Sequence, residues 1–195
     1  MRSGVFFDRD GTVNVEVGYL HDVEKLSLIP GAAKAIRRLN ILGWPVLCVS
    51  NQSGVARGYF SIDAVYKVNQ KLEDLLAAEG AHLDGMYFCP HHPTEGHYPY
   101  RINCECRKPG SGMLEKAASK FDIDLKRSFL IGDRFTDIQT AQLAGLKAIL
   151  VLTGYGKTEL ENIKNKKRIQ PDHICEDIGA AVDWILKQKS LNLDS

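Results

Sequence analysis

A short apolar run that ends in two carboxylates constrains this chain more than any other feature. Val5-Phe6-Phe7 leads directly into Asp8-Arg9-Asp10-Gly11-Thr12. A short, continuous apolar run is typical of a strand that is buried on both faces of a parallel sheet. Ligands of open α/β sheets bind at the carboxyl ends of such strands. The stretch therefore predicts a buried parallel strand with Asp8 and Asp10 at a binding site.

Asp8 and Asp10 are expected to project to the same side of the chain, because side chains alternate along an extended strand. Two carboxylates this close repel each other, and the repulsion raises one pKa unless a cation lies between them. Magnesium suits such a place because it prefers oxygen ligands and keeps several waters. The alternative is an ordinary Asp-Gly turn after the strand, and this stretch alone does not decide between the two.

The composition is that of a globular protein with one sizeable core. Of the 195 residues, 44% are hydrophobic and 25% are charged, with a formal net charge of +1. We therefore expect residues 1–195 to form a single domain. A net charge near zero gives no strong electrostatic attraction for nucleic acid or anionic lipid. No apolar stretch is long enough to span a bilayer. Carboxylates interrupt the first apolar run before it could serve as a signal peptide, so a cytoplasmic location is predicted.

Strands alternate with helices along the rest of the chain. Gly43 is placed to end the first helix, Ser61 to cap the second and Gly145 to close a later one. The expected strands cover residues 5–7, 45–49, 84–88, 128–132, 147–152 and 173–175. The expected helices run from 31 to 43, from 61 to about 79, and over 113–121, 138–143 and 178–187. Residues 153–170 are expected to form a polar surface segment in which the basic run 165–168 is a solvated loop. The alternation predicts an α/β fold with a parallel sheet covered on both faces.

Polar side chains follow several of the expected strands. They are Asp8 and Asp10, Ser50 and Asn51, Arg107 and Lys108 just before a helix, and Asp133. A parallel sheet would bring all of them to one rim. One carboxylate could attack phosphorus while a second protonates the leaving oxygen and later activates water. A metal and a lysine would neutralise the phosphoryl oxygens, so the set predicts a phosphoryl-transfer site.

A cluster of cysteines and a histidine predicts a metal site. Cys89-Pro90-His91 and Cys104-Glu105-Cys106 are separated by residues 92–103, which have no apolar periodicity. Three thiolates and one imidazole suit a tetrahedral structural zinc, which would order the loop in place of a core. The alternatives are reduced surface thiols or a redox pair at Cys104 and Cys106, with His92 as a neighbouring alternative ligand. The other two cysteines, Cys48 and Cys175, are expected to be small buried hydrophobes.

Taken together, the motifs resemble the haloacid dehalogenase superfamily of phosphatases. Residues 8–12 resemble its first motif, Ser50 after residues 46–49 its second, Lys108 its third, and residues 132–137 its fourth. The resemblance implies a Rossmann-like parallel sheet without a large cap domain, and a compact enzyme that could work as a monomer.

The same resemblance assigns roles to the motif residues. Asp8 would be the nucleophile, and Asp10 the general acid and base that also gives its backbone carbonyl to Mg²⁺. Ser50 and Lys108 would hold and neutralise the phosphoryl group. Asp133 would complete the magnesium ligands with Asp8. Asp137 is expected either to support these ligands from behind without binding the metal or to be an acid on the surface of a helix. A structural role is favoured.

The zinc loop, together with residues 51–58 and 14–19, is similar to the family of D-glycero-D-manno-heptose 1,7-bisphosphate 7-phosphatases. This resemblance implies removal of the C7 phosphate in nucleotide-heptose biosynthesis, and a zinc loop over 89–106 that positions Arg107 and Lys108. The implied zinc ligands are Cys89, His91, Cys104 and Cys106. The implied substrate contacts are Glu16, Val17, Gly18, Tyr19, Ser50, Asn51, Gln52, Ser53, Arg107, Lys108 and Arg134. The family usually has lysine where this chain has Arg134, and threonine is common at the place of Ser50.

Three other functions compete with this one. Histidinol-phosphate phosphatases have a similar zinc loop, but an aspartate usually stands at the position of Ser53. A 3′ nucleic-acid end-processing domain is disfavoured by the near-neutral charge and by the lack of an aromatic and basic strand-binding surface. A catalytically inactive, zinc-stabilised binding module is disfavoured because Asp8, Asp10 and Lys108 are all present.

Overall fold

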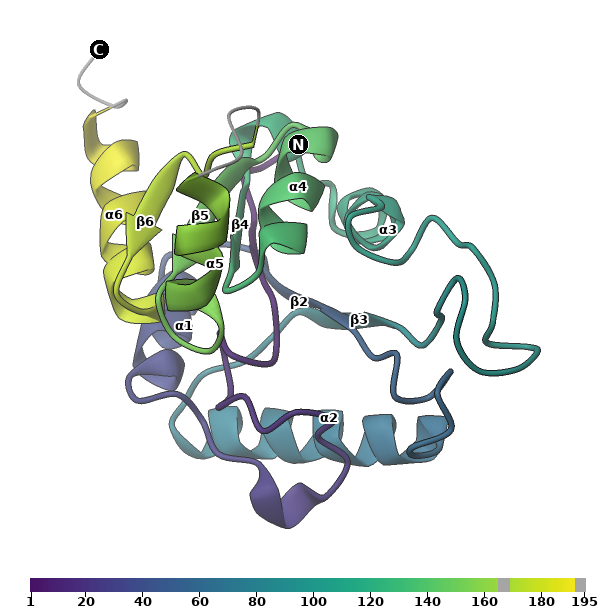
Figure 1. Cartoon of the computed structure of the whole chain (residues 1–195). Helices are drawn as coiled ribbons and strands as arrows, with labels where there is room; N and C mark the ends of the chain where they lie inside the picture. Colours follow the sequence, from purple (N-terminus) through teal and green to yellow (C-terminus); the bar gives the residue numbers. More distant parts are fainter. Residues whose placement is uncertain (165–168, 192–195) are drawn as a thin grey trace.

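Six parallel strands form one sheet at the centre of the computed structural model (Figure 1), which describes residues 1–164 and 169–191. The strands are β1 (Val5–Phe7), β2 (Val46–Asn51), β3 (Gly85–Cys89), β4 (Phe129–Gly132), β5 (Lys147–Val151) and β6 (His173–Cys175). Their order is β3-β2-β1-β4-β5-β6, and every neighbouring pair is parallel. The expected parallel sheet is confirmed, with β1 near its middle.

Helices cover both faces of the sheet. They are α1 (Ala32–Ile41), α2 (Ile62–Ala78), α3 (Gly112–Phe121), α4 (Phe135–Ala144), α5 (Gly156–Lys164) and α6 (Ile178–Leu191). Two short 3-10 helices, η1 (Val23–Lys25) and η2 (Leu125–Arg127), lie in connections. The first apolar cluster joins α1, α2 and α6 to one face, and the second joins α3 and α4 to the other. Within the described residues no segment forms a large cap over the sheet (Figure 1).

The apolar run of β1 is explained by burial on both faces of the sheet. Val5 and Phe7 pack in the first cluster and Phe6 packs in the second, and all three side chains are fully buried. A central strand of a covered sheet has no solvent face, so it needs no polar residue until it ends. The first polar side chain after β1 is Asp8, as the sequence predicts.

The expected helix signals are confirmed at three positions. The Ser61 hydroxyl accepts a hydrogen bond from the backbone N–H of Ala64 at the start of α2. Gly43 follows α1 with a φ of 69°, and Gly145 ends α4 with a φ of 80°. Residues other than glycine adopt this left-handed conformation at a cost in strain, so the glycines set where these helices stop.

The segment 153–170 lies mostly at the surface where it is described, as expected, but it also forms a helix that was not predicted. It contains the helix α5, and Leu160 and Ile169 pack against the second apolar cluster. Too few apolar residues fall in this segment to display a helical period, so tertiary packing decides its structure. Two other helices are longer than expected, since α4 begins at Phe135 and α6 runs to Leu191. The basic run 165–168 lies outside the described residues. None of the helices described is long and apolar enough to cross a membrane.

Candidate active site

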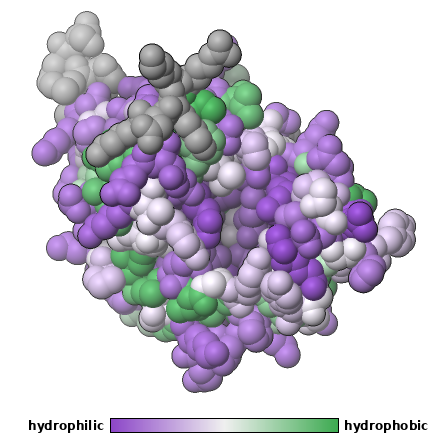
Figure 2. All heavy atoms as spheres, in the orientation of Figure 1, coloured by the Kyte–Doolittle hydropathy of each residue, from purple (hydrophilic) through white to green (hydrophobic). Residues whose placement is uncertain are grey.

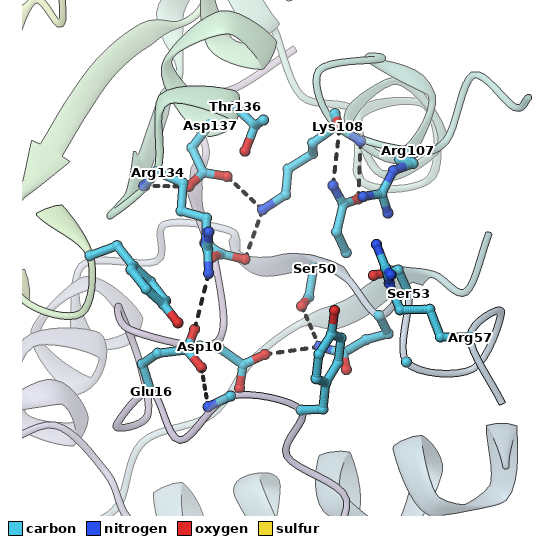
Figure 3. A pocket seen from close by; sticks show the side chains of 17 residues that line it. Asp10, Glu16, Ser50, Ser53, Arg57, Arg107, Lys108, Arg134, Thr136 and Asp137 are labelled. Carbon is cyan, nitrogen blue, oxygen red and sulfur yellow. Dashed lines mark hydrogen bonds and ion pairs between the residues drawn. The ribbon is translucent and has the colours of Figure 1, made fainter. Parts of the chain in front are cut away.

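The strand ends of the sheet open into a cavity of about 340 Å³. Figure 2 shows a hollow bordered by hydrophilic side chains on the face seen in Figure 1. The predicted residues that line the cavity are Asp8, Asp10, Glu16, Gly18, Tyr19, Ser50, Asn51, Gln52, Ser53, Arg107, Lys108 and Arg134. Val17, which was also expected there, does not line it and has an exposed side chain. Arg57, Thr136 and Tyr155 line it without having been predicted (Figure 3).

The ammonium group of Lys108 is buried among three acceptors. Its Nζ lies 2.7 Å from Oδ1 of Asp8, 2.6 Å from Oδ1 of Asp137 and 2.9 Å from the carbonyl oxygen of Val49. Burial alone would lower the pKa of Lys108, but the two carboxylates outweigh burial and raise this pKa above its ordinary value. Lys108 therefore carries a fixed positive charge against the end of β1.

Asp8 and Asp133 are buried carboxyl groups with raised pKa values. Burial raises the pKa of Asp8 to about 7, although Lys108 opposes the change. Burial and the charges of Asp8 and Asp137 raise the pKa of Asp133 to about 8. Oxygens of these three carboxylates lie within 4.8 Å of one another, and Oδ1 of Asp133 is buried with no hydrogen-bond partner in the part of the chain that the structure describes. Such a set of hard oxygen donors fits a divalent cation like Mg²⁺.

Asp137 is buried, and it contacts groups on both sides. Its Oδ2 accepts a hydrogen bond of 3.0 Å from the backbone N–H of Arg134 and so caps α4, while its Oδ1 pairs with Lys108. The alternative of a helix-surface acid is therefore wrong, because the residue is 1% exposed. By capping the helix, Asp137 has the structural role that was favoured. The same carboxylate also holds the ammonium group of Lys108 in place beside Asp8.

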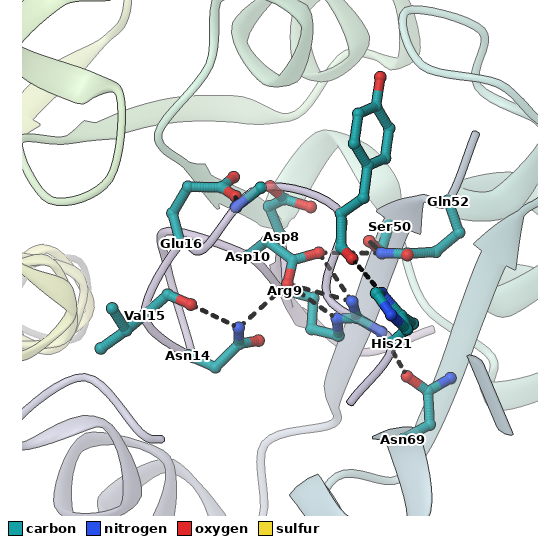
Figure 4. A network of polar contacts seen from close by, with 12 residues as sticks. Asp8, Arg9, Asp10, Asn14, Val15, Glu16, His21, Ser50, Gln52 and Asn69 are labelled. Carbon is teal, nitrogen blue, oxygen red and sulfur yellow. Dashed lines mark hydrogen bonds and ion pairs between the residues drawn. The ribbon is translucent and has the colours of Figure 1, made fainter. Parts of the chain in front are cut away.

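Asp10 is held by donors from three directions (Figure 4). Its carboxylate accepts hydrogen bonds from Arg9 Nη2 at 2.9 Å, Asn14 Nδ2 at 3.0 Å and Gln52 Nε2 at 2.9 Å. Arg9 is itself 1% exposed and donates to Asn69. These contacts fix the orientation of a carboxylate whose side chain keeps 16% exposure. The role of Arg9 was not predicted, although a cation between two acidic residues was visible in the sequence.

Gln52 links the first two motifs. Its Nε2 donates both to Oδ2 of Asp10 and, at 2.8 Å, to the hydroxyl oxygen of Ser50. Because that hydroxyl accepts from Gln52, its own proton is free to point to another acceptor in the cavity. A phosphoryl oxygen is such an acceptor.

Two glycines allow the backbone to approach Asp133 closely. Gly11 has a φ of 81° and Gly154 a φ of 53°, and a Cβ on either would collide with the Asp133 carboxylate. The tyrosine that follows Gly154 donates its backbone N–H to Oδ2 of Asp133 at 2.8 Å. Gly11 therefore both turns the chain after β1 and leaves room for the Asp133 carboxylate.

The four predicted zinc ligands come together. The three Sγ atoms of Cys89, Cys104 and Cys106 lie 3.0 to 3.4 Å from one another. Nδ1 of His91 lies 3.1 Å from Sγ of Cys104 and 3.4 Å from Sγ of Cys106. None of these cysteines forms a disulfide. Three thiols and one imidazole nitrogen within 4.8 Å fit a tetrahedral metal ion. His92 is not part of this cluster, and its Nε2 lies 3.2 Å from Nη2 of Arg57.

The loop that follows the cluster is joined to the cavity through polar contacts. Arg107 Nη1 donates to the carbonyl oxygen of His91 at 3.1 Å. The next residue, Lys108, exchanges two backbone-to-side-chain hydrogen bonds with Asn51 at the end of β2. The ligand cluster is therefore continuous with the residues that place the lysine.

A second wall of the cavity is built from Glu16, Arg134 and Tyr155. Nη2 of Arg134 lies 3.7 Å from Oε2 of Glu16, and its guanidinium carbon lies 3.8 Å from the centre of the Tyr155 ring. Burial would lower the pKa of Arg134, but the carboxylates of Asp133 and Glu16 outweigh it and raise that pKa. Tyr155 was missed because it lies in the segment that was expected to be surface.

Comparisons with known proteins agree with this geometry. The family model described as HAD-hydrolase-like matches residues 105–181. A D-glycero-D-manno-heptose-1,7-bisphosphate 7-phosphatase of Thermosynechococcus vestitus is 50% identical over 188 residues, which cover 94% of this chain and 95% of that protein. A D-glycero-beta-D-manno-heptose-1,7-bisphosphate 7-phosphatase of Pasteurella multocida is 42% identical and covers 92% of this chain and 94% of its own length.

The chain belongs to this family of HAD-like phosphatases. A solved relative supports the membership. The D,D-heptose 1,7-bisphosphate phosphatase of B. bronchiseptica, complexed with magnesium and phosphate, is 32% identical with a TM-score of 0.83. The match covers 95% of this chain and 99% of that one. This phosphatase is therefore a phosphoric monoester hydrolase, and the expected superfamily and fold are confirmed.

Proposed function

We propose that this phosphatase removes the C7 phosphate of D-glycero-D-manno-heptose 1,7-bisphosphate in nucleotide-heptose biosynthesis. The observation that carries the proposal is the cavity in which Asp8, paired with Lys108 at 2.7 Å, lies beside Asp10. It occurs in a chain that is 50% identical to a protein named for this reaction. Magnesium and zinc are its proposed metals.

In the first step, one carboxylate oxygen of Asp8 attacks the C7 phosphorus. The bond between phosphorus and the sugar oxygen breaks, and its electron pair stays on that oxygen. Asp10, in its protonated form, gives this oxygen a proton. The contacts of Asp10 with Arg9, Asn14 and Gln52 support this role because they fix the acid in one orientation. The product of the step is an aspartyl-phosphate on Asp8.

In the second step, water attacks the phosphorus of the aspartyl-phosphate. The carboxylate of Asp10 accepts a proton from the water, the bond between phosphorus and Asp8 breaks, and inorganic phosphate leaves. Lys108 neutralises the phosphoryl oxygens in both steps, and the hydroxyl of Ser50 donates to one of them. The burial of Lys108 supports this role, because its charge is not screened by water.

The metals have separate tasks. Asp8, Asp133 and the backbone carbonyl of Asp10 would hold Mg²⁺, which neutralises negative charge on the phosphoryl group when bound. Cys89, His91, Cys104 and Cys106 would hold Zn²⁺ in a structural site, because four protein ligands leave no open position for substrate.

The substrate contacts follow from the cavity lining. The proposed contacts are Glu16, Gly18, Tyr19, Ser50, Asn51, Gln52, Ser53, Arg107, Lys108 and Arg134. Glu16 and the amide groups can bind sugar hydroxyls, while the arginines can bind phosphate. A cytoplasmic location is proposed because three neighbouring thiols stay reduced there. Action as a monomer is proposed on the ground that one chain supplies every residue named here.

Phosphate release with Mg²⁺ from each anomer of heptose 1,7-bisphosphate and from histidinol phosphate tests the proposal. We expect preferential hydrolysis of one heptose anomer, with phosphorus NMR showing loss of the C7 resonance and retention of the C1 resonance. Preference for histidinol phosphate would keep the chemistry and reject the substrate. Zinc content of the purified protein, measured by atomic emission, tests the second metal.

A further inference from the structure

Arg9 carries a positive charge into the interior of the protein. Its side chain is 1% exposed, and it does not line the cavity that Asp10 lines. Its Nε and Nη2 atoms lie 2.9 to 3.3 Å from the carboxylate oxygens of Asp10. Among the described residues, Asp10 is the only ion-pair partner of Arg9. A buried charge is costly unless it is paired and its donors are satisfied, so the positions of Arg9 and Asp10 depend on each other.

The third nitrogen of the Arg9 guanidinium has a partner on a distant helix. Nη1 donates to Oδ1 of Asn69 at 2.9 Å (Figure 4). Asn69 lies in the middle of α2, 60 positions along the chain from Arg9, and it does not line the cavity. Its amide oxygen is neutral, so it satisfies Nη1 without adding a second negative charge that would compete for Arg9. Asp10 thereby keeps the whole charge of the guanidinium.

Helix α2 holds Asn69 firmly towards the interior. Val65 and Leu72 lie about one turn before and after Asn69 on the same side of the helix, and their side chains are 1% and 0% exposed. Asparagine is a poor residue for a helix interior, because its side chain competes for backbone hydrogen bonds. Helix formation therefore does not account for Asn69, whereas its bond to Arg9 does.

The other donors to Asp10 come from the edge of the sheet. Asn14 belongs to the loop after β1, and Gln52 follows the end of β2 directly. Asn69 instead belongs to a helix that packs on one face of the sheet. The bond between Arg9 and Asn69 therefore connects the orientation of Asp10 to a part of the fold that touches no substrate.

We propose that Asn69 is a positioning residue that holds Asp10 in the orientation needed for proton transfer, and that it acts through Arg9. The inference rests on the function proposed above, in which Asp10 gives a proton to the leaving sugar oxygen. Without the Asn69 oxygen, a buried donor of a charged group has no acceptor, and the guanidinium must turn to find one. Asp10 moves with its counter-charge, and a proton donor works only within hydrogen-bond reach of the leaving oxygen.

The test compares two substrates that differ in their need for a proton. The sugar alkoxide of heptose 1,7-bisphosphate must be protonated as it leaves, whereas the p-nitrophenolate of p-nitrophenyl phosphate leaves as an anion. The ratio kcat/KM reports on this first step for both substrates. In Asn69→Leu we expect kcat/KM for the bisphosphate to fall by about tenfold, which is part of the roughly 10²- to 10⁴-fold contribution of a positioned general acid. For p-nitrophenyl phosphate we expect a fall of less than about twofold.

The choice of variants separates the lost acceptor from other effects. Leucine has nearly the shape of asparagine, so no water can enter to replace the missing oxygen. Asn69→Gln keeps a neutral amide oxygen and should recover part of the loss. Gln70→Leu is the matched control, because Gln70 is the next residue of α2, is exposed and donates to Asp74 of the same helix. We expect it to change kcat/KM for neither substrate. Where thermal unfolding shows that Asn69→Leu is misfolded, Asn69→Ala takes its place.

Three results would overturn the inference: unchanged kcat/KM in Asn69→Leu, equal losses on both substrates in that variant, or the same selective loss in Gln70→Leu. Asp10→Asn distinguishes a failure of the inference from a failure of the proposed function. It should show a larger selective loss than Asn69→Leu, and equal losses on both substrates in Asp10→Asn would remove Asp10 as the acid. If the wild-type protein prefers histidinol phosphate, whose leaving oxygen is also an alkoxide, the same comparison is made with that substrate.

Discussion

Asn51 and Lys108 exchange two hydrogen bonds of 3.0 Å. The side-chain amide of Asn51 donates to the carbonyl oxygen of Lys108, and its Oδ1 accepts from the backbone N–H of Lys108. The two residues are 57 positions apart in sequence. This exchange holds the backbone of Lys108 against the end of β2. The position of the Lys108 ammonium group therefore depends on the contacts of its backbone with Asn51 as well as on its own contacts with the aspartates.

Replacement of Asn51 by alanine should slow catalysis without removing any group that touches phosphorus. We expect kcat to fall by about 10- to 100-fold, because loss of two hydrogen bonds of about 1 kcal/mol each lets Lys108 move from Asp8. Asn40→Ala is the matched control. Asn40 makes the same double exchange with the backbone of His82, at 3.1 and 2.9 Å, and neither residue lines the cavity. Steady-state kinetics should show the loss in the first variant alone, and equal kcat values in both variants would contradict the prediction.

Asp8→Asn should abolish turnover and leave the fold intact. The amide cannot attack phosphorus, so phosphate release should fall by at least about 10³-fold. The fold should persist because Lys108 keeps its second carboxylate partner, Asp137. Release of phosphate measured beside circular dichroism separates the two effects. Turnover near the wild-type rate by a folded Asp8→Asn protein would remove Asp8 from the role of nucleophile.

Cys104→Ser should lose the proposed zinc and loosen the segment that carries Arg107 and Lys108. The serine oxygen is a much weaker zinc ligand, and the loop has no apolar core to replace the metal. Metal analysis should show loss of stoichiometric zinc, and hydrogen exchange should rise at residues 92–108. Cys175→Ser is the control, because Cys175 is buried away from the cluster and should leave the zinc content unchanged. Full zinc retention in Cys104→Ser would reject this ligand set.

The buried carboxylates predict opposite effects of pH on the metal-free and magnesium-loaded protein. Burial raises the pKa of Asp8 to about 7 and that of Asp133 to about 8, above the values of about 4 in an unfolded chain. Between pH 4 and 8 the folded state therefore binds more protons than the unfolded state. The free energy of unfolding of the metal-free protein should fall as pH rises through this window.

Magnesium should reverse that trend. The ion needs the charged carboxylates, so its binding displaces protons, and its affinity should rise by about tenfold per pH unit for each proton released. Titrations of Mg²⁺ followed by thermal unfolding at pH 6, 7 and 8 measure the effect. The same midpoint shift at all three pH values would show that the carboxylates are already ionised in the metal-free protein.

Several parts of the site could be predicted because each depends on residues that are close together in sequence. An apolar strand must end where its first charged residues stand, so β1 places Asp8 and Asp10 at the sheet edge. The pairs Cys89–His91 and Cys104–Cys106 are close enough in sequence to share one ion. The caps Ser61, Gly43 and Gly145 fix helix ends through local hydrogen bonds and backbone angles.

Other parts depend on contacts between distant segments. The sequence alone places Asp137 just before the expected helix 138–143, but α4 begins at Phe135, and its packing against β4 brings the Asp137 carboxylate to Lys108. Tyr155 and Arg57 lie in stretches whose polarity resembles that of any surface loop. They reach the cavity only because the connections after β5 and β2 fold back over the strand ends.

The chain by itself determined the parallel sheet, the order of the motifs and the candidate reacting groups, because each depends on local periodicity or on residue type at a strand end. The tertiary structure alone decided which charges are compensated. Arg134 has Glu16 and Lys108 has two aspartates, whereas the Nε of Arg57 has no hydrogen-bond partner among the described residues. Ion pairing is set by distances of a few ångströms between side chains far apart in sequence, and no local pattern carries that information.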